Sequence, residues 1–169
     1  MTLNKADLRL RLRTIRNNMS EQDRQKFSDA IARKLMAFDW TNVHLLHCYE
    51  PIKNLNEVNT ALFIREIERH FPNVQLFTSR YIGNEWRIVS LQDETVQQST
   101  HFDVIIVPML GFDEHLHRIG YGGGYYDRFL ATQEQAQKIG LCFELCQVKQ
   151  IPSEAHDIPL DIIVTEAAT

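Results

Sequence analysis

The sequence predicts an α/β fold, a three-layer α/β/α sandwich with a largely parallel sheet. Helical and strand patterns alternate along the chain, and residues 103–110, "DVIIVPML", form a continuous apolar, β-branched run. Such a run is typical of a strand buried on both faces, as strands of parallel sheets are. Because no repeat, low-complexity tract or linker divides the 169 residues, we expect one domain over 1–169.

The N-terminal part predicts two helices, then a strand and another helix. Residues 5–18 place apolar side chains on one stripe, as an amphipathic helix does. Ser20, followed three residues later by Asp23, resembles a weak capping box, so a second helix is expected to begin there. The pattern then changes: residues 43–49 favour a strand, and residues 60–71 favour a helix with one apolar face.

The rest of the chain predicts the body of the sheet. Residues 86–91 alternate between apolar and polar, whereas the run 103–110 is apolar throughout. Strands are expected at 74–79, 86–91, 103–110, 139–143 and 161–165, and a short helix over 127–137.

Composition limits the class of function. A formal net charge of −4 argues against a nucleic-acid-binding surface, which usually carries a basic excess. Three cysteines without paired spacing favour a reducing cytoplasm. The sequence contains no 18-residue apolar stretch, so neither a membrane span nor a signal peptide is expected. We therefore expect a soluble, cytoplasmic protein with neither nucleic acid nor membrane as partner. Composition does not give the oligomeric state; a monomer that binds small molecules is our expectation.

The stretch 117–129, "HRIGYGGGYYDRF", is the strongest local signal of function. Four of the seven glycines lie within residues 120–124, in the loop between the buried strand and the following helix. Glycines let backbone N–H groups approach an anion, and the start of a helix adds further donors. Arg118 and Arg128 flank the loop and could bind phosphate oxygens. The alternative is a tight turn with Tyr125 and Tyr126 packed in the core.

Charged residues elsewhere could complete a phosphate site. Asp127 could compensate the helix dipole or supply an oxygen ligand to Mg²⁺. The loop "SEAHDIPLD" offers further carboxylates, among them Asp157. In the first helix, one stripe is basic, and it could present two cations to an anion or be simply solvated. That stripe comprises Lys5, Arg9, Arg13 and Arg16.

The chain resembles the 5-formyltetrahydrofolate cyclo-ligase family from residue 5 to residue 166. The glycine–tyrosine block is the most specific part of this resemblance, and the N-terminal Lys-x-x-Leu-Arg is weak alone. The matching segments are "KADLR" (5–9), "RNNMSEQDR" (16–24), "NEVNT" (56–60), "DVIIVPMLGFD" (103–113), "RIGYGGGYYDRFL" (118–130), "IGLCFELCQ" (139–147) and "IPSEAHDIPLDIIVTE" (151–166).

The resemblance implies a fold like the sugar-phosphate isomerase and CoA-transferase class. It also implies ATP- and Mg²⁺-dependent conversion of 5-formyltetrahydrofolate to 5,10-methenyltetrahydrofolate, with release of ADP and phosphate. The family's ATP ligands match Lys5, Arg9, Arg118, Ile119, Gly120, Tyr121, Gly122, Gly123, Gly124, Tyr125 and Tyr126. Its folate-binding residues match Glu57, Tyr121, Gly122, Gly123, Gly124 and Tyr125, its Mg²⁺ ligands match Asp127 and Asp157, and Arg118 and Tyr125 are expected to act on the reacting groups.

Two departures from the family pattern concern the folate side. Asn59 stands where the family usually has Asp, and we expect little effect if this residue serves a turn. The segment 92–101 is shorter than in most members.

Other functions and sites remain open from the sequence. The chain could be an ATP-dependent phosphoryl transferase with another small substrate, or a non-enzymatic folate or nucleotide binder. His115 and His117 could form a metal pair, but no other His or Cys lies at ligand spacing, so a metal site is not expected there.

Overall fold

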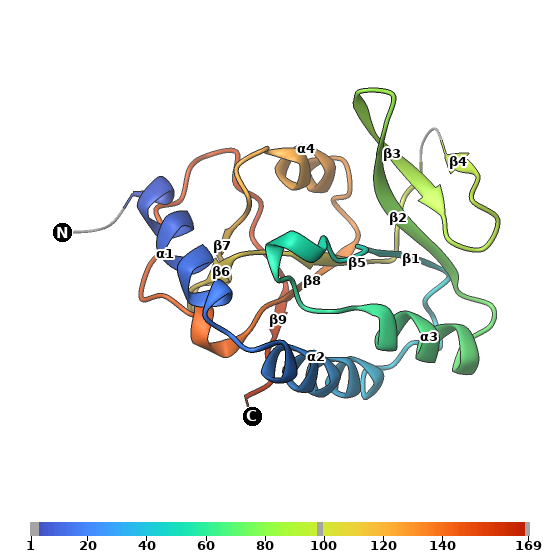
Figure 1. Cartoon of the computed structure of the whole chain (residues 1–169). Helices are drawn as coiled ribbons and strands as arrows, with labels where there is room; N and C mark the ends of the chain where they lie inside the picture. Colours follow the sequence, from blue (N-terminus) through green and yellow to red (C-terminus); the bar gives the residue numbers. More distant parts are fainter. Residues whose placement is uncertain (1–3, 98–99, 168–169) are drawn as a thin grey trace.

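The computed structural model describes residues 4–97 and 100–167. Its main sheet has the strand order β4-β3-β2-β1-β5-β8-β9, and a two-stranded sheet pairs β6 with β7. Figure 1 shows α2 and α3 on one side of the main sheet and α4 on the other. The predicted α/β class is therefore confirmed, with a sheet that is mostly parallel and mixed.

The helices and strands follow the order expected from the sequence patterns. The helices are α1 (Lys5–Asn17), α2 (Glu21–Met36), α3 (Ala61–His70) and α4 (Tyr125–Ala131), with 3-10 turns η1 (Lys53–Leu55) and η2 (Glu144–Cys146). The strands are β1 (Leu45–Cys48), β2 (Gln75–Ile82), β3 (Glu85–Ser90), β4 (Val96–Gln97), β5 (Val104–Pro108), β6 (Gly111–Phe112), β7 (Arg118–Ile119), β8 (Gln137–Leu141) and β9 (Ile162–Val164).

The centre of the sheet is parallel, as the apolar run 103–110 predicts. Every residue of β5 is buried, and β5 pairs in parallel with both β1 and β8. The Ser20 cap is also present, since its side chain accepts a hydrogen bond from the Asp23 N–H at 3.0 Å. This bond fixes the start of α2, which packs its buried face under the sheet.

The antiparallel edge of the sheet differs from the simplest expectation. β2 and β3 form a hairpin in which Ile82 pairs with Glu85, so only two residues make the turn. These are Gly83 and Asn84, and both have positive φ, at 57° and 73°. Such two-residue turns favour residues that tolerate the left-handed region. The Gly-Asn pair was therefore a hairpin signal, and it makes this side of the sheet antiparallel.

Helix α4 is shorter than the predicted helix over 127–137. It ends at Ala131, because Gln137 already belongs to β8 and pairs with Val104 of β5. Between these elements, the Gln133 side chain accepts a hydrogen bond from the Phe102 N–H and donates one to the Thr100 carbonyl. The tie to the start of β5 ends the helical turn before the strand begins.

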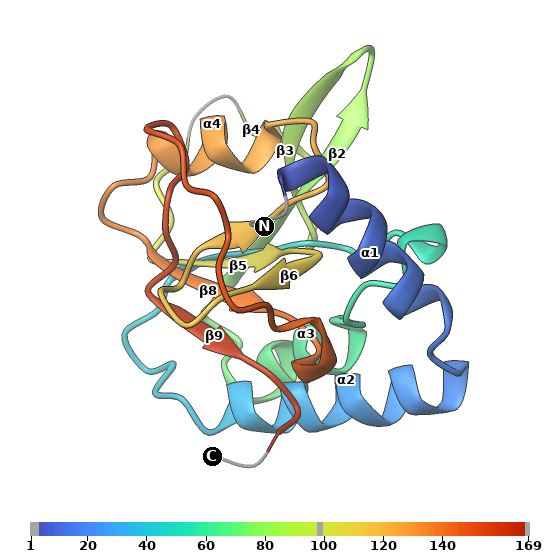
Figure 2. The ribbon, with the colours of Figure 1, turned by 90° about the vertical axis from the view of Figure 1, so that its left-hand side faces the viewer.

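The small sheet β6–β7 places Arg118 at the end of the buried core. Its connecting turn is organised by Asp113, which is 1% exposed. The Asp113 carboxylate accepts hydrogen bonds from the N–H groups of His115, His117 and Ile151. Although burial alone would raise it, these hydrogen bonds hold the pKa of Asp113 below its usual value. The turn is thus fixed by a buried carboxylate, and Figure 2 shows α1 packed beside this part of the fold.

Among the described residues, no helix combines the length and apolar character that a membrane span requires.

Candidate active site

The fourteen residues that the family resemblance assigns to a site line one cavity of about 310 Å³. Arg128, which also flanks the glycine loop, does not line it and instead donates to the Gly123 carbonyl at 3.3 Å. The cavity is bounded by the start of α1, the glycine loop before α4, and the loop before β9. These segments are far apart in the sequence. The fourteen predicted residues are Lys5, Arg9, Glu57, Arg118, Ile119, Gly120, Tyr121, Gly122, Gly123, Gly124, Tyr125, Tyr126, Asp127 and Asp157.

The glycine loop uses its glycines for conformation and for close approach. Gly122 and Gly124 have φ of 102° and 64°, a region that side chains rarely adopt. Gly124 is also the N-cap of α4. At Gly123, by contrast, an added Cβ would meet no atom of the described residues within 4 Å, so this residue borders open space. The loop therefore leaves a gap beside its backbone, as an anion-binding loop requires.

Arginines of α1 hold the loop by its carbonyl groups. The Arg9 Nε–H donates to the Gly120 carbonyl at 3.0 Å, and Arg13 donates to the Tyr121 carbonyl at 3.3 Å. In a trans peptide, the C=O and N–H groups point in opposite directions. Because these carbonyl groups face α1, the N–H groups of the same peptides point away from it, and the bonds orient the loop. The basic stripe is thus partly engaged in the fold, rather than simply solvated.

Arg118 and Asp127 form an ion pair at the floor of the cavity. The Arg118 Nη2 lies 2.5 Å from Asp127 Oδ1, and its Nη1 donates to the Ile158 carbonyl at 2.5 Å. The Arg118 side chain is only 5% exposed. Asp127 is therefore more than a solvent-facing residue in the first turn of a helix, because it neutralises a nearly buried guanidinium.

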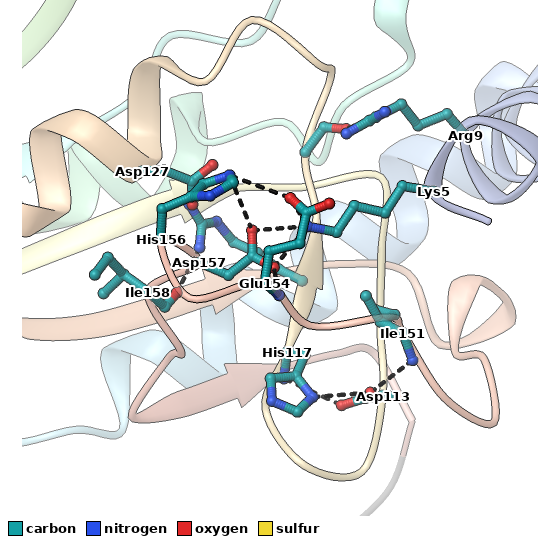
Figure 3. Close-up of polar contacts among 12 residues, drawn as sticks. Lys5, Arg9, Asp113, His117, Asp127, Ile151, Glu154, His156, Asp157 and Ile158 are labelled. Atoms are coloured by element: carbon teal, nitrogen blue, oxygen red, sulfur yellow. Dashed lines mark hydrogen bonds and ion pairs between the residues drawn. The ribbon is translucent and has the colours of Figure 1, made fainter.

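A second ion pair joins the first helix to the loop before β9 (Figure 3). The Lys5 ammonium donates to Asp157 Oδ2 at 2.6 Å, to Asp157 Oδ1 at 2.8 Å and to Glu154 at 3.1 Å. Burial tends to lower the pKa of Lys5, but the bonds to Asp157 and Glu154 raise it overall. Burial likewise tends to raise the pKa of Asp157, and the bond from Lys5 lowers it overall. Both groups are therefore charged near neutral pH.

Possible ligands for a cation gather at the same loop. One donor atom each from Glu154, His156 and Asp157 lies within 4.8 Å of the others. The His156 ring contacts Glu154 at 3.2 Å and is largely exposed. Asp127 lines the same cavity, and Arg118 connects it to the Ile158 carbonyl of this loop. The sequence alone could not show that these two acidic segments meet.

Glu57 is buried behind the glycine loop, at the end of a polar chain that begins at Arg16. Arg16 is 1% exposed and donates to the Tyr121 hydroxyl at 3.0 Å. The Glu57 carboxylate accepts a hydrogen bond from the Ile52 N–H at 2.6 Å. Burial raises the pKa of Glu57, and the Ile52 bond, the Tyr121 hydroxyl and the charge of Arg16 oppose this rise. A solvated Arg16, one possibility for the basic stripe, is excluded.

An aromatic wall closes the cavity on the side of the β2–β3 hairpin. The Tyr125 ring stacks on Trp86, with centroids 4.8 Å apart, and on Phe129, with centroids 5.7 Å apart. Trp86 is 41% exposed and lines the cavity, so it lies on its rim. The sequence is compatible with Trp86 in the core or at a rim but does not place it beside Tyr125. The Gly83–Asn84 turn was the signal that could have brought β3 there.

Asn59 and His117 both take part in turns. Asn59 Oδ1 accepts a hydrogen bond from the Ala61 N–H at 3.0 Å, at the start of α3, so it serves a turn as expected. The His117 ring contacts the buried Asp113 at 3.1 Å, and its centroid lies 6.1 Å from that of His115. His117 thus belongs to the Asp113 turn (Figure 3). Part of the short segment 92–101, residues 98–99, lies outside the described residues.

Comparisons with known proteins agree on one family. Residues 84–166 match the model of the 5-formyltetrahydrofolate cyclo-ligase family. A 5-formyltetrahydrofolate cyclo-ligase of Mycoplasma genitalium is 29% identical over 170 residues, covering 96% of this chain and 98% of that protein. The corresponding enzyme of Escherichia coli K12 is 40% identical over 119 residues, covering 69% of this chain and 62% of that protein. The chain belongs to the 5-formyltetrahydrofolate cyclo-ligase family.

Solved structures show the same fold. A 5,10-methenyltetrahydrofolate synthetase from Mycoplasma pneumoniae matches with a TM-score of 0.85 at 23% identity, covering 98% of this chain and all of that one. The synthetase from Aquifex aeolicus matches with a TM-score of 0.78 at 26% identity, covering 97% and 90%. These matches include the N-terminal elements that the family model does not reach. By its family, the protein is an enzyme of the ligase class.

Proposed function

We propose that this protein catalyses the ATP-dependent cyclisation of 5-formyltetrahydrofolate to 5,10-methenyltetrahydrofolate, with release of ADP and phosphate. One observation carries the proposal beyond family membership: a glycine loop, three basic side chains, a buried glutamate and an aromatic wall meet in one cavity. The glycine loop and the basic side chains suit the phosphates of a nucleotide, and the glutamate and the aromatic wall suit a flat, polar ring system. The loop would hold the phosphates, and the wall with Glu57 would hold the folate.

The chemistry asks for positioning and charge neutralisation rather than a covalent intermediate on the protein. The formyl oxygen attacks the γ-phosphorus of ATP, and the bond between this phosphorus and the bridging oxygen of ADP breaks. The N10 nitrogen then attacks the formyl carbon and loses its proton, and the former formyl oxygen leaves with the phosphate. Each step moves negative charge onto oxygen atoms of the phosphate groups.

Basic groups and backbone donors are placed to stabilise that charge. Lys5, Arg9 and Arg118 line the cavity together with the glycines 122–124, and open space lies beside Gly123, where backbone N–H groups could reach a phosphate. Charge-assisted hydrogen bonds from such donors are about twice as strong as those between neutral groups. In this proposal, Arg118 acts on the transferring phosphoryl group and the other donors bind ATP.

Glu57 and Tyr125 would position the folate. The Glu57 carboxylate can accept hydrogen bonds from the N–H donors of a pterin ring. Burial raises the pKa of Glu57, so protonation at low pH would remove this acceptor. The Tyr125 ring, held between two aromatic rings, offers an edge and a hydroxyl to a planar ligand. Tyr121 links the two sides, because it belongs to the loop and its hydroxyl bonds Arg16 beside Glu57.

The carboxylates suit the Mg²⁺ that the family resemblance implies. Asp127 and Asp157 both line the cavity, and oxygen ligands are the ones that Mg²⁺ prefers. When bound there, Mg²⁺ would neutralise phosphate charge during phosphoryl transfer. In the protein itself, Lys5 pairs with Asp157 and Arg118 pairs with Asp127, and these ion pairs orient the two carboxylates.

The test mixes the purified protein with 5-formyltetrahydrofolate, ATP and Mg²⁺ and follows the near-ultraviolet absorbance of the methenyl product. Each component is omitted in turn as a control, and ADP is measured in parallel. Product that requires all components supports the proposal. ATP binding and ADP release without methenyl product would favour a phosphoryl transferase with another substrate. Saturable binding without ADP would favour a folate or nucleotide binder.

The remaining expectations belong to the same proposal. Helices on both faces of the sheet support an α/β/α sandwich of the sugar-phosphate isomerase and CoA-transferase class. We also propose that the chain forms one domain over 1–169 and acts in the cytoplasm as a monomer on small molecules.

A further inference from the structure

A chain of three polar groups runs from the core of the sheet to the cavity. The His47 Nε2 lies 2.7 Å from the Ser79 Oγ, and the Ser79 Oγ lies 2.6 Å from the Tyr125 hydroxyl. The three residues come from β1, β2 and α4. Ser79 and Tyr125 line the cavity, whereas His47 has no exposed surface. The chain therefore connects a fully buried imidazole with a hydroxyl at the candidate site.

The buried imidazole is electrically neutral. Its ring lies among Phe102, Tyr126 and Phe129, with centroid distances of 5.4, 6.2 and 4.9 Å. Burial among these rings lowers the pKa of His47 to about 3. A neutral imidazole carries one N–H donor and one acceptor nitrogen. The role of His47 thus depends on which nitrogen holds the proton.

The pairing of its nitrogens indicates the direction of the chain. The His47 Nδ1 is buried and has no hydrogen-bond partner among the described residues. A buried N–H without a partner is rarer than an acceptor without one, so we assign the proton to Nε2. The Nε2–H then donates to Ser79, and the Ser79 hydroxyl donates to the Tyr125 oxygen. This arrangement leaves the Tyr125 proton free to be donated into the cavity.

Packing fixes the position of the same hydroxyl. The Tyr125 ring is stacked between Trp86, at an interplanar angle of 29°, and Phe129, at 12°. The Tyr126 ring meets it edge-on, with centroids 5.2 Å apart. Two stacking partners restrict rotation of the ring, and the bond to Ser79 restricts the hydroxyl. A donor whose position and direction are both set needs no reorganisation during a reaction.

We propose that His47 and Ser79 are positioning residues, which make the Tyr125 hydroxyl a fixed hydrogen-bond donor to an oxygen of the bound substrate. The inference rests on the proposed function. The oxygen that passes from the formyl group to the phosphate gains negative charge as it leaves, so it is the acceptor that benefits most from such a donor. Neither His47 nor Ser79 needs to touch the substrate, because both act through Tyr125.

The test is a double-mutant cycle of Ser79→Ala and Tyr125→Phe, with kcat and KM measured for 5-formyltetrahydrofolate. Loss of one such hydrogen bond lowers kcat by about tenfold, which is within the range for single hydrogen bonds. We expect Ser79→Ala to lower kcat by about this factor while KM changes by less than about twofold. Because Ser79 acts through the Tyr125 hydroxyl, the double variant should be no slower than Tyr125→Phe alone.

His47→Phe tests the buried end of the chain. Phenylalanine keeps the ring packing and removes the unpartnered Nδ1, so we expect Tm to remain within about 3 °C of the wild-type value. In the wild-type background kcat should fall in the same direction as with Ser79→Ala. In the Ser79→Ala background it should not fall further. Ser90→Ala is the matched control, since Ser90 is a buried serine of the neighbouring strand β3 that does not line the cavity.

Independent effects would overturn the inference. If Ser79→Ala and Tyr125→Phe multiply, if His47→Phe adds to Ser79→Ala, or if the loss lies wholly in KM, the chain does not position Tyr125. An unchanged kcat in Ser79→Ala has the same consequence. If the wild-type protein itself forms no methenyl product, the proposed function fails first, and the inference fails with it. Normal wild-type turnover with additive variants refutes the positioning role alone.

Discussion

Two neighbouring glycines of the loop allow folding and phosphate binding to be separated by one substitution each. A Cβ added to Gly123 would meet no atom of the described residues within 4 Å, and the φ of this residue lies outside the left-handed region. Gly124 has φ of 64°, and an added Cβ would lie 2.9 Å from Arg128 Nη1. We therefore expect Gly123→Val to affect ligand binding and Gly124→Val to affect the stability of the fold.

The backbone conformations and the open space set the magnitudes. At Gly124, left-handed backbone costs a residue with a Cβ roughly 1–2 kcal/mol, and a β-branched valine suffers at least that much. For a chain of 169 residues, each kcal/mol lowers Tm by about 2–4 °C. At Gly123 we expect the free energy of unfolding to stay within about 1 kcal/mol, because a compatible conformation needs no strain. Blocking one or two charge-assisted bonds to phosphate should raise KM for ATP by about 10- to 100-fold.

Circular dichroism gives Tm of both variants, and steady-state kinetics gives KM for ATP. We predict a near-normal Tm with a high KM for Gly123→Val, and a lowered Tm for Gly124→Val. A Gly123→Val variant with normal KM would mean that the loop is a strand-to-helix turn and not a phosphate cradle. An equal loss of Tm in both variants would show that the space beside Gly123 is not open.

Three other perturbations test the charged groups of the site. Asp127→Ala should abolish turnover and lower stability by about 1–3 kcal/mol, since it leaves the nearly buried Arg118 without its carboxylate. Asp127→Asn should retain more stability while remaining inactive. An active Asp127→Ala variant would refute the assignment of Asp127 to the metal site. The pKa of Glu57 is raised, so KM for the folate should rise as pH falls through that pKa. Glu57→Gln should show a high KM that no longer changes over this pH range. If the variant keeps the wild-type pH dependence of KM, Glu57 is not the folate-binding carboxylate. Lys5→Met should lower stability at pH 7 by about 0.5–1 kcal/mol. Because the pKa of Asp157 is depressed in the folded state, this difference should shrink as pH falls below about 4 and vanish below the depressed pKa in denaturation experiments. A difference that persists there would assign the loss to packing.

Those parts of the site that are local in the chain could be predicted from the sequence. The glycine loop, Asp127 and the start of α4 lie within ten residues, so their spacing alone brings them together. The parallel centre of the sheet followed from the buried run 103–110 and the helices around it. Local pattern and the rules of parallel sheets were sufficient for these features.

Contacts between distant segments could not be read from such patterns. Lys5 and Asp157 are 152 residues apart, and their pairing depends on how α1 docks against the loop before β9. Arg16 belonged to a basic stripe, yet this last member turns inward because Tyr121 and the Met109 carbonyl supply partners for the guanidinium. Trp86 reaches the site only because the hairpin at Gly83 folds β3 back onto β2. Side-chain partners, rather than periodicity, decide these cases.

The two ion pairs suggest how the site accommodates ligands of both signs. Lys5 is bonded to Asp157 and Arg118 is bonded to Asp127, so two of the three cations proposed for phosphate are balanced by carboxylates proposed for a metal ion. A phosphate ligand that draws the two cations away would leave both carboxylates without a counter-charge. Nucleotide and divalent cation should therefore bind with positive coupling, because each removes the charge imbalance that the other would create. The same exchange of partners would keep Arg118, which is only 5% exposed, paired with either the carboxylate or the phosphate.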